Sequence, residues 1–122
     1  IRACATVPRD SGTWISPAFI QAYTELHRAG HAHSLEVWQG DDLVGGLYGV
    51  AVGGFFAGES MFHRATDASK VALVHTHRRL CERGFTLFDT QMVTSVTGLL
   101  GAVEIPRLEY LRRLKPAVER DC

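Results

Sequence analysis

The sequence lacks an excess of charge, a regular set of cysteines and a long apolar run. Lysine plus arginine and aspartate plus glutamate number 13 each, so the overall charge indicates neither a nucleic-acid nor a membrane partner. The three cysteines are widely spaced without any C-x-x-C pair, which argues against a disulfide framework or zinc knuckle and favours the reducing cytoplasm. The longest apolar stretch, residues 43–57, is interrupted by five glycines, so we expect no membrane span.

The length and composition are typical of one globular domain. A chain of 122 residues with 46% hydrophobic and 21% charged residues can bury a single core. We therefore expect residues 1–122 to form a single domain. Because the chain opens at Ile1 rather than at methionine, we also expect a region upstream of it.

A first helix is predicted over residues 17–29. Ser16 precedes it as an N-cap, Pro17 takes the first helical position, and Gly30 follows where a left-handed residue commonly ends a helix. The predicted apolar face consists of three residues at helical spacing: Phe19, Tyr23 and Leu26.

An antiparallel meander of three strands is predicted next, over 33–39, 43–52 and 55–60. Tight turns at Gly40-Asp41-Asp42 and Gly53-Gly54 connect them. The glycines of the middle strand form no G-x-G-x-x-G and precede no helix. We therefore interpret them as bulges or points of close backbone approach rather than as a dinucleotide loop.

A second helix, residues 68–83 with Asp67 as N-cap, leads to a strand over 85–91. A helix between two strands is a crossover, so the third and fourth strands can be parallel neighbours. The predicted stripe of this helix consists of Ala68, Val71, Ala72, His75 and Arg79. Pro106 opens a last helix and Pro116 ends it, with an apolar stripe of Leu108, Leu111 and Leu114. This order of elements resembles the acetyltransferase-like (GNAT-type) α/β fold.

Asp89 and Gln91 are the strongest candidates for chemistry. Residues i and i+2 of a strand project from the same face, here at the carboxyl end, where ligands gather in open α/β sheets. The crossover is expected to bring Glu59 close to this pair. A carboxylate in such a place suits a general base. Two other interpretations stay open, because Asp89 can also cap a turn or pair with an arginine.

Histidine pairs and basic helix faces are weaker candidates. His75 and His77 lie about 200° apart around a helix and cannot share a ligand, whereas His31 and His33 can share a strand face. Without a third ligand at a suitable distance, we predict surface histidines and no metal site. The basic residues form either a phosphate-binding surface or solvated helix faces; they are Lys70, Arg78, Arg79, Arg83, Arg107, Arg112, Arg113 and Lys115.

Seven short runs follow one another over nearly the whole chain. They are Thr13-Trp14-Ile15-Ser16-Pro17, residues 31–38, residues 43–50, Gly58-Glu59-Ser60-Met61-Phe62, Ala68-Ser69-Lys70, Asp89-Thr90-Gln91 and residues 100–107. Together and in this order they resemble the leucyl/phenylalanyl-tRNA–protein transferase family. That family's amino-terminal domain, with its Trp-Gly-Cys-Asn motif, is absent from residues 1–122, and the usual carboxyl-terminal tail is short.

The resemblance implies an enzyme, an aminoacyltransferase that moves Leu or Phe from aminoacyl-tRNA to the α-amine of a protein beginning with Arg or Lys. This transfer marks the acceptor protein for degradation through the N-degron pathway. No cofactor, metal or acetyl-CoA is implied. We expect a cytoplasmic monomer that needs no membrane.

The resemblance also implies roles for individual residues. Asp89 and Gln91 correspond to a catalytic pair that relays a proton from the attacking amine. Glu59 and Trp14 correspond to positions that hold the aminoacyl-adenosine end. The pocket for the Leu or Phe side chain is implied at four apolar positions: Leu47, Phe56, Met61 and Phe88. Thr76 departs from the family, because it stands where an aromatic pocket residue is expected.

Two alternatives remain beside this hypothesis. The chain can be a fragment that binds tRNA or a peptide without catalysis, as the missing domain suggests. It can also be a small-molecule N-acetyltransferase of similar fold. The second alternative is disfavoured, because the chain has His63-Arg64-Ala65-Thr66-Asp67 where such enzymes carry a glycine-rich pyrophosphate loop before the crossover helix.

Overall fold

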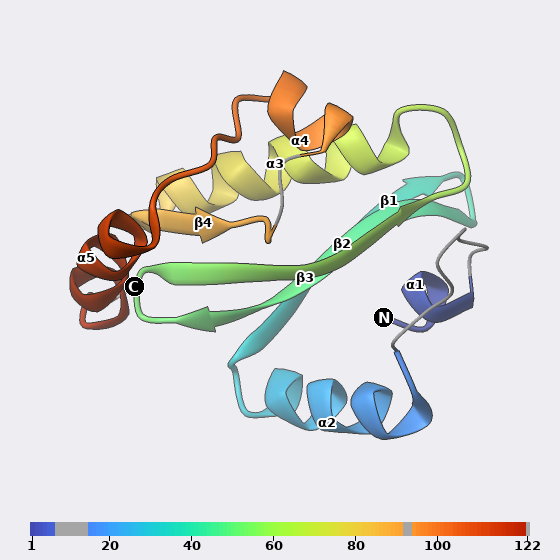
Figure 1. Ribbon diagram of the computed structural model, residues 1–122. Coiled ribbons are helices and arrows are strands. Elements are labelled where there is room, and N and C mark those ends of the chain that lie inside the picture. The colour runs from blue at the N-terminus through green and yellow to red at the C-terminus, as the bar shows by residue number, and fades with distance from the viewer. Residues whose placement is uncertain (7–14, 92–93, 122) are drawn as a thin grey trace.

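A four-stranded mixed sheet in the order β1-β2-β3-β4 is the framework of the protein (Figure 1). The computed structural model describes residues 1–6, 15–91 and 94–121. The strands are β1 (Ala32–Gln39), β2 (Asp42–Val52), β3 (Phe55–His63) and β4 (Leu87–Asp89). The helices are α1 (Arg2–Thr6), α2 (Pro17–Arg28), α3 (Ala68–Glu82), α4 (Ser95–Leu99) and α5 (Arg107–Val118).

The predicted meander is confirmed. Strands β1, β2 and β3 pair antiparallel, and β3 continues three residues beyond the predicted end at residue 60. The pairing slips between Tyr48 and Gly49, which marks a bulge. A Cβ atom at Gly49 would collide with the carbonyl oxygen of Ala57, and one at Gly45 would lie 2.6 Å from Ala68 Cβ. The glycines therefore permit the bulge and the close approach of α3.

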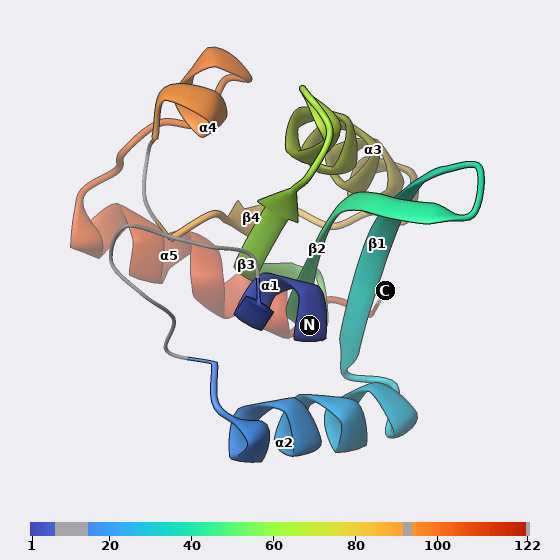
Figure 2. The same ribbon diagram turned by 90° about the vertical axis from the view of Figure 1, so that its right-hand side faces the viewer.

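The crossover through α3 is also confirmed. Strand β4 runs parallel to β3, with Phe56 opposite Phe88 and Ala57 opposite Asp89. Helix α3 covers one face of the sheet, and α2 lies on the other side (Figures 1 and 2). The outcome is a mixed α/β structure in which β4 forms one edge of the sheet.

The predicted stripe of α3 is wrong for Val71, His75 and Arg79, which are exposed. The buried side of the helix consists of Ala68, Ser69, Ala72, Leu73, Thr76 and Leu80. This rotation places the small Ala68 against Gly45 and buries two leucines instead of a histidine and an arginine. Burial of leucine is favourable and burial of an unpaired charge is costly, so α3 packs on the sheet with its leucine-bearing side.

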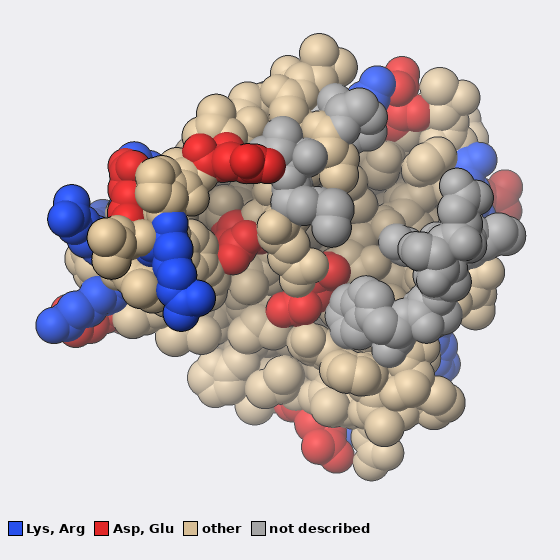
Figure 3. Space-filling model, in the orientation of Figure 1, with Lys and Arg blue, Asp and Glu red and all other residues tan. Residues whose placement is uncertain are grey.

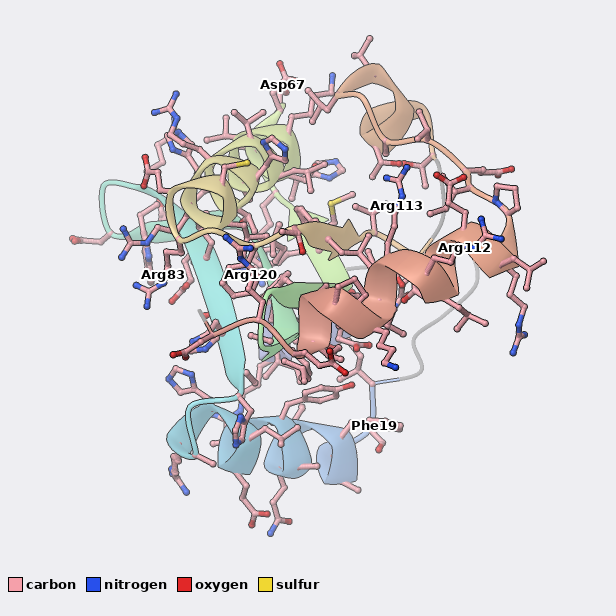
Figure 4. All side chains as sticks on the ribbon, turned by 90° about the vertical axis from the view of Figure 1, so that its left-hand side faces the viewer. Phe19, Asp67, Arg83, Arg112, Arg113 and Arg120 are labelled. Atoms are coloured by element: carbon pink, nitrogen blue, oxygen red, sulfur yellow. The ribbon has the colours of Figure 1, made fainter. Side chains whose placement is uncertain are left out.

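Asp67 takes the predicted N-cap position of α3, but its side chain does not cap the helix. Asp67 occupies the N-cap position but has a left-handed backbone with φ 64°, and its side chain makes no capping hydrogen bond. Capping side chains normally belong to residues in the extended region. Instead, the carboxylate lies 3.1 Å from Lys70 Nζ, at the exposed start of the helix (Figure 4).

Helix α2 begins as predicted. The Ser16 hydroxyl accepts a hydrogen bond of 3.3 Å from the backbone nitrogen of Phe19, and Gly30 follows the helix with φ 88°. The predicted apolar face is confirmed for Tyr23 and is wrong for Phe19 and Leu26, which are exposed. Ile20 and Tyr23 contact the core, whereas Phe19 is 44% exposed.

Helix α5 packs along the β4 edge of the sheet, and two expectations for it are wrong. Pro116 lies inside the last turn of the helix and does not end it. The helix tolerates this proline, since its missing N–H removes only one hydrogen bond. Leu108, with 71% exposure, and Leu111 face solvent, while Ala117 is fully buried. The Gly54 backbone nitrogen donates a hydrogen bond of 2.7 Å to the Ala117 carbonyl oxygen, which ties the helix end to the turn after β2.

The core has two parts, one on each face of the sheet. The part under α3 contains Leu47, Phe56, Ala72, Leu73 and Leu80. The part under α1 and α2 contains Cys4, Ile15, Tyr48 and Phe62. The neighbours Leu47 and Tyr48 point to opposite faces, as strand geometry requires. Within the described ranges, every helix is too short or too polar to cross a bilayer.

Candidate active site

Asp89 and Gln91 meet through a turn rather than along one strand. The predicted strand over 85–91 is too long, because β4 ends at Asp89 and Gln91 has φ 71°. The Gln91 backbone nitrogen donates a hydrogen bond of 2.7 Å to Asp89 Oδ1. A carboxylate that accepts from the nitrogen two residues later stabilises such a turn. The alternative that Asp89 caps a turn is therefore confirmed, and the turn itself brings the two side chains to one place.

The second carboxylate oxygen of Asp89 is held by α5. The Tyr110 hydroxyl donates a hydrogen bond of 2.7 Å to Asp89 Oδ2. Burial, followed by the hydrogen bond to Asp89 and the charge of that carboxylate, raises the pKa of Tyr110 to about 12. The phenol is therefore protonated at neutral pH and acts as a donor. The sequence around Tyr110 carries no signal of this contact, because no local pattern links Tyr110 to a residue 21 positions earlier.

Glu59 on β3 completes this hydrogen-bonded group, which confirms that the crossover brings it close. Gln91 Nε2 donates a hydrogen bond of 3.2 Å to Glu59 Oε2. On the other side, burial, the charge of Glu59 and a hydrogen bond to Glu59 raise the pKa of Tyr23 above its ordinary value. A chain of polar contacts therefore extends from Tyr110 on α5, through Asp89, Gln91 and Glu59, to Tyr23 on α2.

Two adjoining cavities flank this group. The smaller has a volume of about 70 Å³ and is lined by Leu47, Gly58, Glu59, Ser60, Met61, Leu73, Phe88, Thr90 and Thr97. The larger, about 850 Å³, lies between α3, β4, α4 and α5, and Asp89, Gln91 and Tyr110 line it. Phe88 and Thr90 belong to both linings. The polar group thus lies where a mainly apolar pocket meets a wide groove.

Charge is unevenly distributed around these cavities. Basic side chains gather over α5, whereas acidic side chains lie toward the hollowed centre of the same face (Figure 3). Arg113 extends from α5 toward α4 and lines the larger cavity (Figure 4), where it pairs with Glu109. Among the residues that the structure describes, no group of three or more His, Cys, Asp or Glu side chains is arranged to hold a metal ion.

The residues predicted for an apolar pocket lie at different depths. Leu47, Met61 and Phe88 line the smaller cavity. Phe56 is buried beneath it, with its ring edge-to-face against Phe88 at 5.6 Å between centroids. Thr76 is buried on α3, where its hydroxyl donates a hydrogen bond of 2.8 Å to the Ala72 carbonyl oxygen. Trp14 lies outside the described residues. Leu73 is a lining residue that the sequence did not single out.

This geometry suits acyl transfer to an amine. An amine must lose a proton as it attacks a carbonyl carbon, and a fixed carboxylate–amide pair can accept or guide that proton. The apolar cavity beside the pair can hold the side chain of the acyl group. Such a site needs no nucleophile from the protein if the acyl group arrives as an activated ester.

Comparison with known proteins identifies the family of this chain. Residues 1–115 match the family model for leucyl/phenylalanyl-tRNA protein transferase. A leucyl/phenylalanyl-tRNA–protein transferase of Solidesulfovibrio magneticus is 56% identical over 123 residues, which cover 99% of this chain and 50% of that protein. One of Ruegeria pomeroyi is 58% identical over 106 residues, covering 87% of this chain and 50% of the relative. The chain therefore spans about half the length of these relatives. It belongs to the leucyl/phenylalanyl-tRNA–protein transferase family, as the ordered sequence runs predicted.

Proposed function

We propose that this chain carries the catalytic centre of an aminoacyltransferase that moves Leu or Phe from aminoacyl-tRNA to an N-terminal Arg or Lys of an acceptor protein. Family membership over residues 1–115 carries this proposal. The site supports it, because an apolar cavity adjoins the hydrogen-bonded group of Asp89, Gln91 and Glu59.

In the proposed reaction, the neutral α-amine attacks the ester carbonyl carbon of the aminoacyl-tRNA. A C–N bond forms, the ester C–O bond breaks, and the ribose oxygen leaves with a proton that the amine has released. Asp89 and Gln91 relay this proton. The ester is already activated, so orientation and proton transfer supply most of the acceleration.

Substrate selection is divided between the two cavities. The smaller cavity holds the Leu or Phe side chain against Leu47, Met61 and Phe88, with Phe56 supporting the Phe88 ring from below. A pocket of this kind separates large from small apolar side chains by about 1–3 kcal/mol. The larger cavity receives the acceptor, whose positive charge is complementary to the carboxylates beside it. Glu59, together with Trp14, holds the aminoacyl-adenosine end.

We further propose an acetyltransferase-like topology, with residues 1–122 as one catalytic domain. The protein acts in the cytoplasm as a monomer without a cofactor, and its product is directed to degradation through the N-degron pathway.

Transfer of labelled Leu from Leu-tRNA to a peptide beginning with Arg tests this function. We expect the chain to transfer Leu, and the Asp89→Ala plus Gln91→Ala variant to be slower by at least about 100-fold. The matched control is Gln39→Ala plus Asp41→Ala, which replaces the same residue types at the exposed end of the first hairpin. Undiminished transfer by the first variant would refute the catalytic roles, and no transfer by the unmodified chain would refute the activity.

A binding role without catalysis is the second candidate, because the chain spans about half of its relatives. Filter binding of Leu-tRNA and turnover, measured on the same preparation, separate the two functions. Tight binding with no turnover would favour the binding role. Efficient turnover excludes it.

A further inference from the structure

We propose that Tyr110 on α5 is a positioning residue for Asp89. The Tyr110 hydroxyl holds the Asp89 carboxylate in the orientation that the site requires. The structural part of this inference stands on contacts alone, whereas its effect on turnover rests on the proposed transferase function. Tyr110 lines the larger cavity together with Asp89 and Gln91, so it lies in the site and not merely near it.

The two oxygens of Asp89 are held by donors from different parts of the chain. Oδ1 accepts from the Gln91 backbone nitrogen and Oδ2 from the Tyr110 hydroxyl, each at 2.7 Å. The first donor belongs to the turn that follows the same strand and cannot fix the carboxylate against the rest of the molecule. The second comes from a separate helix. Two donors on opposite oxygens prevent rotation of the carboxylate, and bonds to a charged acceptor are strong.

Helix α5 can act as a rigid support for this contact. Tyr110 and Ala117 are seven residues apart, about two helical turns, and so lie on the same face. Ala117 is fully buried, and its carbonyl oxygen accepts the hydrogen bond from Gly54 in the turn between β2 and β3. The helix is therefore attached to the sheet at both of these points. The hydrogen bond from the Tyr110 hydroxyl therefore restrains Asp89, the last residue of β4, relative to the sheet.

The basic residue of α5 that lines the larger cavity, Arg113, forms an ion pair with a residue other than Asp89. Arg113, one turn after Tyr110, also lines the larger cavity, but its guanidinium pairs with Glu109 on the same helix. A tyrosine hydroxyl orients the Asp89 carboxylate without neutralising its charge. This property suits a carboxylate that must retain the ability to accept a proton from an amine.

Tyr110→Phe in the full chain tests the positioning role, because it removes one oxygen and keeps the ring. We expect turnover to fall about tenfold to 100-fold, with KM for Leu-tRNA changed less than about twofold and the melting temperature lowered by only a few degrees, because one hydrogen bond is lost. Leu108→Ala, at an exposed position of the same helix, is the control and should leave turnover unchanged. Unchanged turnover in Tyr110→Phe would overturn the proposal. Full recovery of turnover when the variant is assayed well below its lowered melting temperature would instead show a purely structural role and also overturn it.

Nuclear magnetic resonance of labelled tyrosine rings provides a second measurement that needs no activity. The chain has three tyrosines, so the Tyr110 signal is identified by its absence from Tyr110→Phe. We expect Asp89→Asn to shift the Tyr110 signal and to leave that of Tyr48 in place. An unshifted Tyr110 signal would overturn the contact. If the unmodified chain shows no transfer, the proposed function fails, and this measurement still decides whether Tyr110 holds Asp89.

Discussion

Gln91 donates its side-chain amide to Glu59 at 3.2 Å, across 32 residues of sequence. A carboxylate only accepts hydrogen bonds, so Glu59 must face the nitrogen of the Gln91 amide and not its oxygen. The contact therefore sets the orientation of the amide. It also joins the end of β4 to β3 beyond the last paired residues of these strands, Ala57 and Asp89.

Gln91→Glu should destabilise the protein by placing two carboxylates against each other. We expect the free energy of unfolding to fall by about 0.5–1 kcal/mol at neutral pH, because like charges replace a hydrogen bond. Urea denaturation measures this difference. The double variant Glu59→Gln plus Gln91→Glu restores an amide–carboxylate pair and should recover most of the loss. If the double variant is less stable than Gln91→Glu, the two side chains do not interact in solution.

Alkaline pH should weaken the stabilising effect of Tyr110. Its pKa is about 12 in the folded protein and 10.0 for an ordinary tyrosine, so the folded state holds this proton more tightly than the unfolded chain does. The resulting stabilisation is complete below pH 10 and is lost as the pH rises through about 12. The difference in unfolding free energy between wild type and Tyr110→Phe should therefore shrink above pH 10, as urea denaturation at several pH values can show. A constant difference across this range would contradict the shifted titration.

Gly53→Ala should be much more harmful than Gly40→Ala, although both glycines have a positive φ in hairpin turns. A Cβ atom at Gly53 would collide with the Val118 carbonyl oxygen and lie 2.7 Å from that of Arg120, whereas one at Gly40 meets nothing within 4 Å. We expect losses of at least about 3 kcal/mol at Gly53 and about 1 kcal/mol at Gly40 in urea denaturation. Equal losses would show that the end of α5 moves away from the turn easily.

Substitutions of Asp67 can separate the effect of its left-handed backbone from that of a side-chain cap. With φ 64° and no capping hydrogen bond, Asp67→Gly should change the stability by less than about 0.5 kcal/mol, because relief of strain offsets the lost ion pair with Lys70. Asp67→Ala should cost about 1 kcal/mol more, since alanine disfavours this conformation. Equal destabilisation by glycine and alanine would indicate that the side chain caps α3 after all.

Met61→Ala should change which aminoacyl-tRNA is preferred. Met61 lines the smaller cavity, and removing its side chain enlarges the space that we assign to the Leu or Phe side chain. We expect kcat/KM for Phe-tRNA relative to Leu-tRNA to rise about tenfold in competition assays. His63→Ala, at an exposed position two residues later in β3, should leave this ratio unchanged. An unchanged ratio in Met61→Ala would place the amino-acid side chain elsewhere.

Features that depend on neighbouring residues were determined by the sequence itself. The Ser16 cap, the meander with its glycine turns and the parallel crossover follow from local backbone preferences and the handedness of connections. Membership in the family followed from the order of short runs over the whole chain. The proximity of Glu59 to Asp89 and Gln91 also followed, because a crossover makes its two strands neighbours.

Only the tertiary structure decided which of several possible surfaces each element buries and which distant side chains meet. Helix α3 buries Leu73 and Leu80 rather than His75 because its first turn lies against Gly45 of β2 and its inner side packs on the sheet, a choice that depends on the sheet and not on the helix. The contact between Tyr110 and Asp89 exists because α5 packs along the β4 edge. Local sequence specifies backbone conformation, but the burial of one face and the pairing of one carboxylate depend on partners that the chain brings together only when it folds.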